Sequence, residues 1–175
     1  FQGEADIQRT GLSRGLGDVY KGRLQGRVTG RDDRRTLDGL RADLLANQAR
    51  ALADKGERGP AAQRYEAAVR AAPDAPWTRF ALARLYRDMG LPQLGRTVMD
   101  DGLAQGATPE MRYATALYRN SLDDVAGAQA ALAPVDDAHR SDGMRALARK
   151  LDAQSALADA RGPLARRVRP AVAPA

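Results

Sequence analysis

The stretch KGERGPAAQRYEAAVRAAPDAPW (residues 55–77) decides the fold class, because it spans the end of one helix, all of the next and the start of a third. Gly56 permits the positive φ of a tight turn. Pro60 suits the first turn of a helix, where its missing N–H removes no helical hydrogen bond. Pro73 then stops that helix, so that another can begin at Trp77. The stretch therefore predicts a helix hairpin, followed at once by a further helix.

The residues on either side of Gly56 have the spacing of amphipathic helices. In the second helix Ala61, Tyr65 and Ala68 share one face, where the two Ala residues allow close approach and Tyr65 fills the space between successive hairpins. Before Gly56, i, i+3, i+4 spacing relates Thr36, Leu37, Leu40, Leu44, Leu45, Ala49 and Leu52. This pattern predicts helices over residues 34–55 and 60–72.

The pattern returns 34 residues later, since Gly56 aligns with Gly90. At the same step Ala49 aligns with Ala83, Leu52 with Tyr86, Ala61 with Gly95, Tyr65 with Met99, and Ala68 with Gly102. A third copy is weaker and nearer a 33-residue step, with Asp123 in the Gly position, Ala128 in the small position and Leu132 in the bulky one. Helix pairs with this period are the tetratricopeptide-repeat pattern. We therefore expect an all-α array of helix hairpins, a right-handed α-solenoid.

We expect three parts along the chain. Residues 1–30 hold seven Gly and are interpreted as a tag remnant followed by irregular or weakly helical chain. Residues 31–160 form the repeat array, and residues 161–175 form a basic, Pro-rich tail. The expected units are about 42–75, 76–109 and 110–142, with a partial unit at 143–160, and their later helices cover 77–89, 92–105, 110–122, 125–135 and 141–160.

A set of residues is expected to hold the repeats together by packing or by forming the turns. These residues are Leu52, Gly56, Ala61, Tyr65, Ala68, Ala83, Tyr86, Gly90, Gly95, Met99, Ala128 and Leu132. Because Gly90, Gly95 and Gly102 fall in the second hairpin, we also expect that hairpin to pack loosely.

Composition excludes several classes of function. The absence of Cys excludes disulfides and thiolate chemistry, and no apolar run approaches the roughly 18 residues that cross a bilayer. The net charge is +6, but the 28 basic residues are dispersed among 22 acidic ones, which argues against a nucleic-acid partner. His139 is the only His and has no acidic cluster beside it, so we expect no metal and no cofactor.

Paired acidic residues give no hint of catalysis. Side chains of adjacent residues point apart, whereas a carboxylate hydrolase needs two that converge across a cleft. The pairs Asp123-Asp124 and Asp136-Asp137 fall near helix ends, where they suit turns and caps. We therefore expect no catalytic residue and no enzymatic activity.

Two longer stretches carry a family resemblance. RYEAAVRAAPDAPWTRFALARLYRDMGLPQLGRTVMDDGLA (residues 64–104) resembles the repeat region of the bacterial cellulose synthase operon protein C family, with its Pro-Trp start to a helix followed by ALARLYRDMG. PEMRYATALYRNSLDDVAGAQAALAPVDDAHRSDGMRALARKLDA (residues 109–153) is similar to later units of that family. The resemblance covers roughly residues 40–157, and tetratricopeptide repeats in general share much of this pattern.

The resemblance implies a location and partners. It implies a periplasmic segment of a protein that reaches the outer membrane, organises a cellulose synthase complex through protein partners, and can contact β-1,4-glucan or peptidoglycan. Residues 1–30 do not contribute to it.

Tetratricopeptide repeats bind partners on the concave face, which the first helix of each unit lines. Counting along these helices gives Arg50, Trp77, Phe80, Arg84, Arg87, Tyr113 and Asn120 as candidates for contact with a protein or a glycan. Aromatic rings can stack on sugars or peptides, and Arg pairs with carboxylates. The alternative for Trp77, Phe80 and Tyr113 is packing between repeats.

Three functions remain open from sequence. The first is a scaffold segment of a cellulose synthesis and export component. The second is an adaptor that binds a partner peptide in its concave groove, and the third is direct polysaccharide binding with Trp77 and Tyr113 as stacking platforms.

Overall fold

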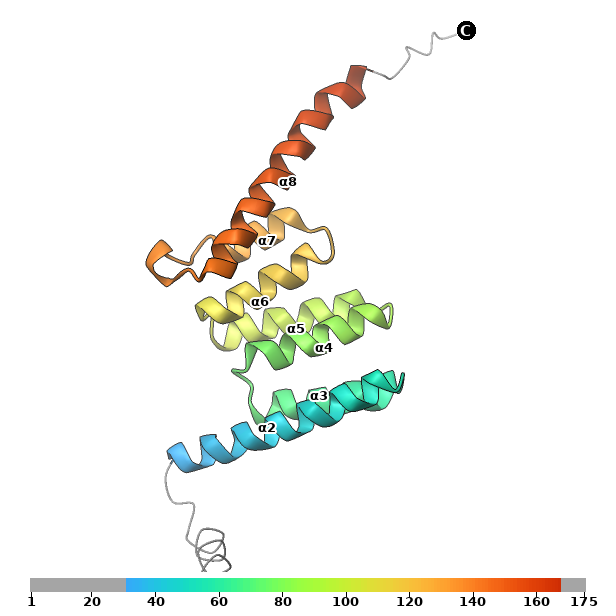
Figure 1. The fold of residues 1–175 in the computed structure, drawn as a ribbon, viewed down its shortest axis with the longest axis vertical. Helices are drawn as coiled ribbons and strands as arrows, with labels where there is room; N and C mark the ends of the chain where they lie inside the picture. The colour runs from blue at the N-terminus through green and yellow to red at the C-terminus, as the bar shows by residue number, and fades with distance from the viewer. Residues whose placement is uncertain (1–30, 168–175) are drawn as a thin grey trace, which may run out of the picture. The chain divides into compact units, whose positions relative to one another are not determined.

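The computed structural model describes residues 31–167, with side chains described for residues 34–160. The helices are α2 (Arg31–Asp54), α3 (Arg58–Ala71), α4 (Pro76–Asp88), α5 (Pro92–Gln105), α6 (Pro109–Asn120), α7 (Val125–Leu132), the short 3-10 helix η1 (Asp137–His139) and α8 (Asp142–Arg167). Between residues 31 and 167 there is no strand, as the all-α prediction requires (Figure 1). The predictions for residues 1–30 lie outside the described part.

The chain divides into two compact units, residues 1–38 and 39–175. In the first unit the described residues are 31–38, which form the beginning of α2. The hairpins and their cores lie within the second unit.

Turns with a positive φ separate the helices of each hairpin. Gly56 has a φ of 82° and Gly90 has a φ of 79°. The third hairpin has Asp123 at φ 57° in the place where the sequence pattern lacks a glycine. Asp is one of the few residues with a side chain that tolerate this region, so all three hairpins turn at equivalent positions.

Proline and side-chain caps fix where helices begin. Pro76, Pro92 and Pro109 are the first residues of α4, α5 and α6, where no helical hydrogen bond is lost. The carboxylate of Asp124 accepts a hydrogen bond from the backbone N–H of Gly127 at 2.9 Å and so caps α7. The predicted turn and cap roles of Asp123 and Asp124 are therefore confirmed, whereas Asp136 precedes η1 without a side-chain cap.

Consecutive helices pack in hairpins, with α4 against α5 and α6 against α7, and α3, α5 and α7 each contact the next helix along the chain (Figure 1). Three apolar cores follow one another, each made by three successive helices. Ala49, Ala61, Ala62, Tyr65, Leu82 and Leu85 form the first; Ala83, Met99, Met111, Ala114 and Tyr118 form the second; and Ala116, Ala128, Ala131, Leu132, Val135, Met144, Leu147 and Leu151 form the third.

Most of the predicted packing positions are buried. Ala61, Tyr65, Ala68, Ala83, Gly95, Met99, Ala128 and Leu132 are buried, and Leu52 and Tyr86 are half-buried against the first core. The Tyr86 hydroxyl also donates a hydrogen bond to a carboxylate oxygen of Glu66 on α3. Gly56 and Gly90 are exposed and serve the turns.

The glycines of α5 lie in close contacts, against the expectation of loose packing. A Cβ on Gly95 would come within 2.6 Å of the Tyr118 ring and 2.7 Å of the Ala83 carbonyl oxygen. A Cβ on Gly102 would come within 2.6 Å of Met111. Neighbouring helices fill the space of the missing side chains, so these residues permit tight packing.

Helix α2 has two apolar sides, and the structure buries only one. Ala42 and Ala49 are buried and Leu45 is half-buried, whereas Leu40 and Leu44 are 62% and 59% exposed. Each residue of a helix is rotated by about 100° from the last, so Leu40 and Leu44 lie about 200° from Ala42. The small Ala side chains, rather than these leucines, face α3.

Helices α7 and α8 end three or more residues away from their predicted ends. Helix α7 ends at Leu132 rather than 135, because Pro134 has no N–H to continue the helical hydrogen bonds. Helix α8 continues to Arg167 rather than ending at 160, so the predicted tail begins as helix. The helix includes Gly162 and Pro163, residue types that are unfavourable in a helix interior and that led the sequence to predict an earlier end.

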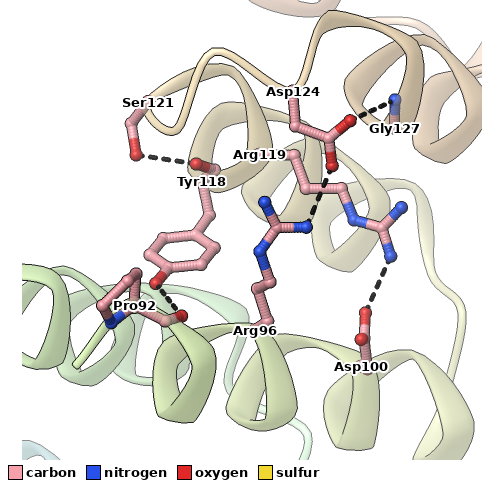
Figure 2. Close-up of polar contacts among 8 residues, drawn as sticks. All are labelled: Pro92, Arg96, Asp100, Tyr118, Arg119, Ser121, Asp124 and Gly127. Atoms are coloured by element: carbon pink, nitrogen blue, oxygen red, sulfur yellow. Dashed lines mark hydrogen bonds and ion pairs between the residues drawn. The ribbon is translucent and has the colours of Figure 1, made fainter.

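Crossed polar contacts join α5 to the α6–α7 hairpin (Figure 2). Arg96 on α5 pairs with Asp124 at 3.2 Å, and Arg119 on α6 pairs with Asp100 on α5 at 2.9 Å. Tyr118, next to Arg119, donates a hydrogen bond to the carbonyl oxygen of Pro92 at 2.8 Å. These contacts fix the second hairpin against the third.

Candidate functional site

Three predicted contact residues form one aromatic cluster: Trp77, Phe80 and Tyr113. The Trp77 ring lies nearly perpendicular to the rings of Phe80 and Tyr113, with centroid distances of 6.0 and 5.9 Å. Arg84 lies one helical turn beyond Phe80, with its guanidinium carbon 5.8 Å from the ring centroid, which is a cation–π distance. Helix α4 therefore presents an aromatic and cationic surface that Tyr113 of α6 extends.

The aromatic cluster combines packing with exposure, so the two interpretations of its residues do not exclude each other. Phe80 and Tyr113 are half-buried against the second and third cores. A Cβ on Gly143 would lie 2.6 Å from the Tyr113 hydroxyl, so Tyr113 also reaches α8. Trp77, in contrast, remains 50% exposed and offers part of its ring to a ligand.

Beside the aromatic cluster lies a hollow surface between α2 and α4, which we name the α2–α4 trough. It consists of two adjoining hollows of about 410 and 330 Å³ that share Arg50, Tyr65 and Ala81 as lining residues. Phe80 and Arg84 line the larger hollow, and Trp77 lines the smaller. The structure thus brings four predicted contact residues, Arg50, Trp77, Phe80 and Arg84, to one trough.

The structure does not bring Arg87 and Asn120 into this trough. Arg87 pairs with its neighbour Asp88 at 2.8 Å, which directs its guanidinium along α4. The side-chain oxygen of Asn120, at the end of α6, is buried and has no hydrogen-bond partner. Both remain predictions as contact residues, but neither belongs to the α2–α4 trough.

Arg79 is a buried residue that the sequence interpretation missed. It is only 3% exposed, and its guanidinium donates to the carbonyl oxygens of Pro73 and Val98 at 2.8 and 2.9 Å and to the side chain of Gln105 at 3.0 Å. Burial lowers the pKa of Arg79, and the charge of Asp101 partly offsets this. Arg79 thereby ties the start of α4 to α5. No spacing signal distinguishes it among so many Arg residues.

The chemistry available here is that of binding. Aromatic faces, guanidinium donors and carboxylate acceptors provide stacking and hydrogen bonding. Across the described helices, His and acidic residues nowhere gather in a group of three that could hold a metal ion. Among residues 31–167, no helix combines the length and apolar character needed to cross a membrane.

Solved structures provide a match to this arrangement. The tetratricopeptide-repeat domain of Sgt2 from Aspergillus fumigatus superposes with a TM-score of 0.53 at 20% identity, covering 77% of this chain and 85% of that one. The chain has a tetratricopeptide-repeat fold. Its 34-residue period, hairpin turns and successive three-helix cores are the features of that fold. No protein-family model matches the chain.

Comparison with curated proteins confirms the resemblance of the sequence to the cellulose synthase operon protein C family. Cellulose synthase operon protein C of Xanthomonas axonopodis pv. citri (strain 306) is 35% identical over 140 residues, which is 73% of this chain. The protein of the same name from Pseudomonas fluorescens (strain SBW25) is 36% identical over 107 residues, 60% of this chain. The chain spans only 9% and 8% of the length of these relatives, so it is similar to a segment of each.

Proposed function

We propose that this chain is a non-catalytic scaffold segment of a periplasmic component for cellulose synthesis and export. Its role is to organise a cellulose synthase complex by binding protein partners. The observation that carries the proposal is the 35% identity over 140 residues to cellulose synthase operon protein C. That name associates the relative with cellulose synthesis, and the repeat fold supplies a surface for partners.

The architecture supports a scaffold. The polar residues that join the second hairpin to the third are paired with one another, as Arg96 is with Asp124 and Arg119 with Asp100. In a repeat array each hairpin contacts only its neighbours. Contacts between neighbouring hairpins therefore determine how the binding surface is arranged. The α2–α4 trough and the aromatic cluster are the surfaces that we assign to binding.

Binding to purified partners tests this role. The full 175-residue chain is immobilised and exposed to separately purified proteins of the cellulose synthase complex, with an unrelated tetratricopeptide-repeat protein as the control surface. Saturable binding of at least one of these proteins to this chain alone is expected. Equal retention on both surfaces for every protein of the complex would contradict the scaffold role.

Direct contact with the glucan or with peptidoglycan is a second candidate role, and the exposure of Trp77 favours it. The indole packs nearly perpendicular to the rings of Phe80 and Tyr113 and is half exposed, so part of its surface stays open in a defined orientation, as a stacking platform requires. A peptide-binding adaptor would use the same residues, with Arg50 and Arg84 pairing with carboxylates.

A further inference from the structure

The residues that line the α2–α4 trough occupy equivalent positions in two successive repeats. On α2 they include Asp43, Asn47, Arg50 and Asp54, and adding 34 to each number gives Trp77, Ala81, Arg84 and Asp88 on α4. All eight line the two hollows. The trough is therefore built from one stripe of each helix, and the stripes match in register.

Two of the four equivalent positions also match in chemistry. Arg50 corresponds to Arg84, and Asp54 corresponds to Asp88. Each Arg–Asp pair stands four residues apart, so both members lie on the same face of their helix. A guanidinium donates hydrogen bonds and a carboxylate accepts them, so the trough offers the same donor and acceptor twice. Such a surface suits a ligand that is itself a repeat of one chemical unit.

The polar groups of the α2 stripe are not used inside the protein. The side chains of Asp43, Asn47, Arg50 and Asp54 form no hydrogen bond or ion pair in the part of the chain that the structure describes. On α4, Arg84 contacts the ring of Phe80, and Asp88 pairs with Arg87. Whereas the residues drawn in Figure 2 pair with one another, the polar side chains of the α2 stripe are free to bind a ligand.

The charges of the trough decide against an ionic ligand. The carboxylates of Asp43, Asp54 and Asp88 stand beside the guanidiniums of Arg50 and Arg84, so neither sign dominates. An acidic peptide or an anionic glycan would meet repulsion from the carboxylates as well as attraction from the guanidiniums. A neutral ligand rich in hydroxyl groups can use both, since each hydroxyl donates and accepts.

We propose that the α2–α4 trough binds a neutral β-linked glucan chain, with Trp77 stacking on a sugar ring and the two Arg–Asp pairs binding hydroxyls of successive parts of the chain. The stripe from Trp77 to Asp88 is about 16 Å long at the rise of a helix, so it accommodates a short run of linked sugars. This inference rests on the proposed function, because it takes the chemistry of cellulose as the candidate ligand.

The single Trp of the chain makes the test local. The full chain is titrated with cellohexaose, cellobiose, a muropeptide and an acidic peptide while Trp77 fluorescence is recorded at low and high salt. The expected result is a saturable, salt-independent shift with cellohexaose, and a weaker one with cellobiose, which can engage fewer repeated groups. Binding only of the muropeptide or only of the acidic peptide, weakened by salt, would overturn the proposal.

Variants assign the response to the trough. Arg50→Ala with Arg84→Ala should weaken cellohexaose binding about tenfold or more, because each removes a charge-assisted hydrogen bond. Arg64→Ala, at an exposed position of α3 outside the trough, should leave the affinity unchanged. Trp77→Ala is followed by calorimetry, with folding checked by circular dichroism. Equal affinities for the Arg50/Arg84 and Arg64 variants would overturn the assignment.

Failure of this inference can be told from failure of the scaffold role. A folded chain that binds purified proteins of the synthase complex but gives no saturable response to cellohexaose contradicts only the glucan assignment. A chain that binds cellohexaose and none of those proteins contradicts only the scaffold.

Discussion

The ring of Tyr118 on α6 fills the space that a side chain on Gly95 of α5 would need. A Cβ at Gly95 would approach the ring to 2.6 Å, and the Tyr118 hydroxyl donates to the Pro92 carbonyl oxygen at 2.8 Å (Figure 2). Burial raises the pKa of Tyr118, so the hydroxyl stays protonated and able to donate. The Tyr118 ring of the third hairpin therefore packs into the space that the absent side chain of Gly95 leaves in the second hairpin, and we call this contact the interlock.

Gly95→Ala should destabilise the protein by about 1–3 kcal/mol, the usual cost of inserting a methyl group into a packed core. The Ala83 carbonyl oxygen also lies in the way at 2.7 Å, so a shift of Tyr118 alone gives no full relief. Urea unfolding followed by circular dichroism measures the change. Gly39→Ala is the control: a Cβ there meets nothing within 4 Å, so helix propensity should make it neutral or stabilising. Equal effects at the two positions would contradict the interlock.

Arg79→Ala should cost about 3 kcal/mol or more, since it leaves two buried backbone carbonyl oxygens without the donor that satisfies them. Those carbonyls belong to Pro73 and Val98. Arg79→Lys should recover only part of the loss, because an ammonium cannot match the planar donors of a guanidinium. Thermal unfolding provides the comparison, and Arg64→Ala provides an exposed control. A melting temperature for Arg79→Ala equal to that of the control would contradict a stabilising role for the hydrogen bonds of Arg79.

Asp124→Ala should destabilise by about 1–2 kcal/mol, chiefly through the lost cap of α7. The ion pair with Arg96 is partly exposed and adds little. Asp124→Asn keeps an oxygen that can accept from the Gly127 N–H, so it should lose much less. Chemical unfolding measures the free energy of unfolding of both variants. If Asp124→Asn and Asp124→Ala lose the same amount, the stabilisation comes from the charge of Asp124 rather than from the cap.

Tyr86 should make stability sensitive to alkaline pH. Burial and then the hydrogen bond and charge of Glu66 raise its pKa to about 12, whereas the unfolded value is about 10. Its stabilising contribution is complete below about pH 10 and is lost as the pH rises towards 12. The unfolding free energy of the wild type should therefore fall over this window relative to that of Tyr86→Phe. A constant difference between the two proteins would contradict the pKa shift.

The hairpin architecture could be predicted from sequence because it depends on local signals. Gly56, Gly90 and the prolines at helix starts act through backbone geometry alone, and Asp123 could be placed by its register in the period. The bounds of α5 were predictable for the same reason, with Pro92 at one end.

The remaining features depend on residues far apart in the sequence. A glycine at position 95 could loosen the packing of α5 or make room for a side chain of a neighbouring helix. Tyr118, which lies on the next helix, decides between these two effects. Arg79 is indistinguishable from a surface Arg until Pro73, Val98 and Gln105 surround it. The leucines of α2 have helical spacing, but the small Ala42 and Ala49 decide which side α3 covers.

Part of the candidate site was also accessible to sequence. Counting along the first helices predicted Trp77, Phe80, Arg84 and Arg50, which the α2–α4 trough brings together. It did not separate them from Arg87 and Asn120, because helical register alone shows neither that Arg87 pairs with Asp88 nor that the Asn120 side-chain oxygen is buried. The carboxylate of Asp54 was not predicted, and its place in the site is apparent only from the hollow that it lines together with α4 residues.

The most direct test of the account is cellulose output in cells that carry Trp77→Ala with Arg84→Ala in the gene encoding this chain. Both side chains line the trough and neither fills a core, so the protein should accumulate normally on an immunoblot while secreted cellulose falls well below the wild-type level. Arg64→Ala should leave output unchanged. Wild-type output from the double variant at wild-type protein levels would contradict the claim that this surface serves cellulose synthesis.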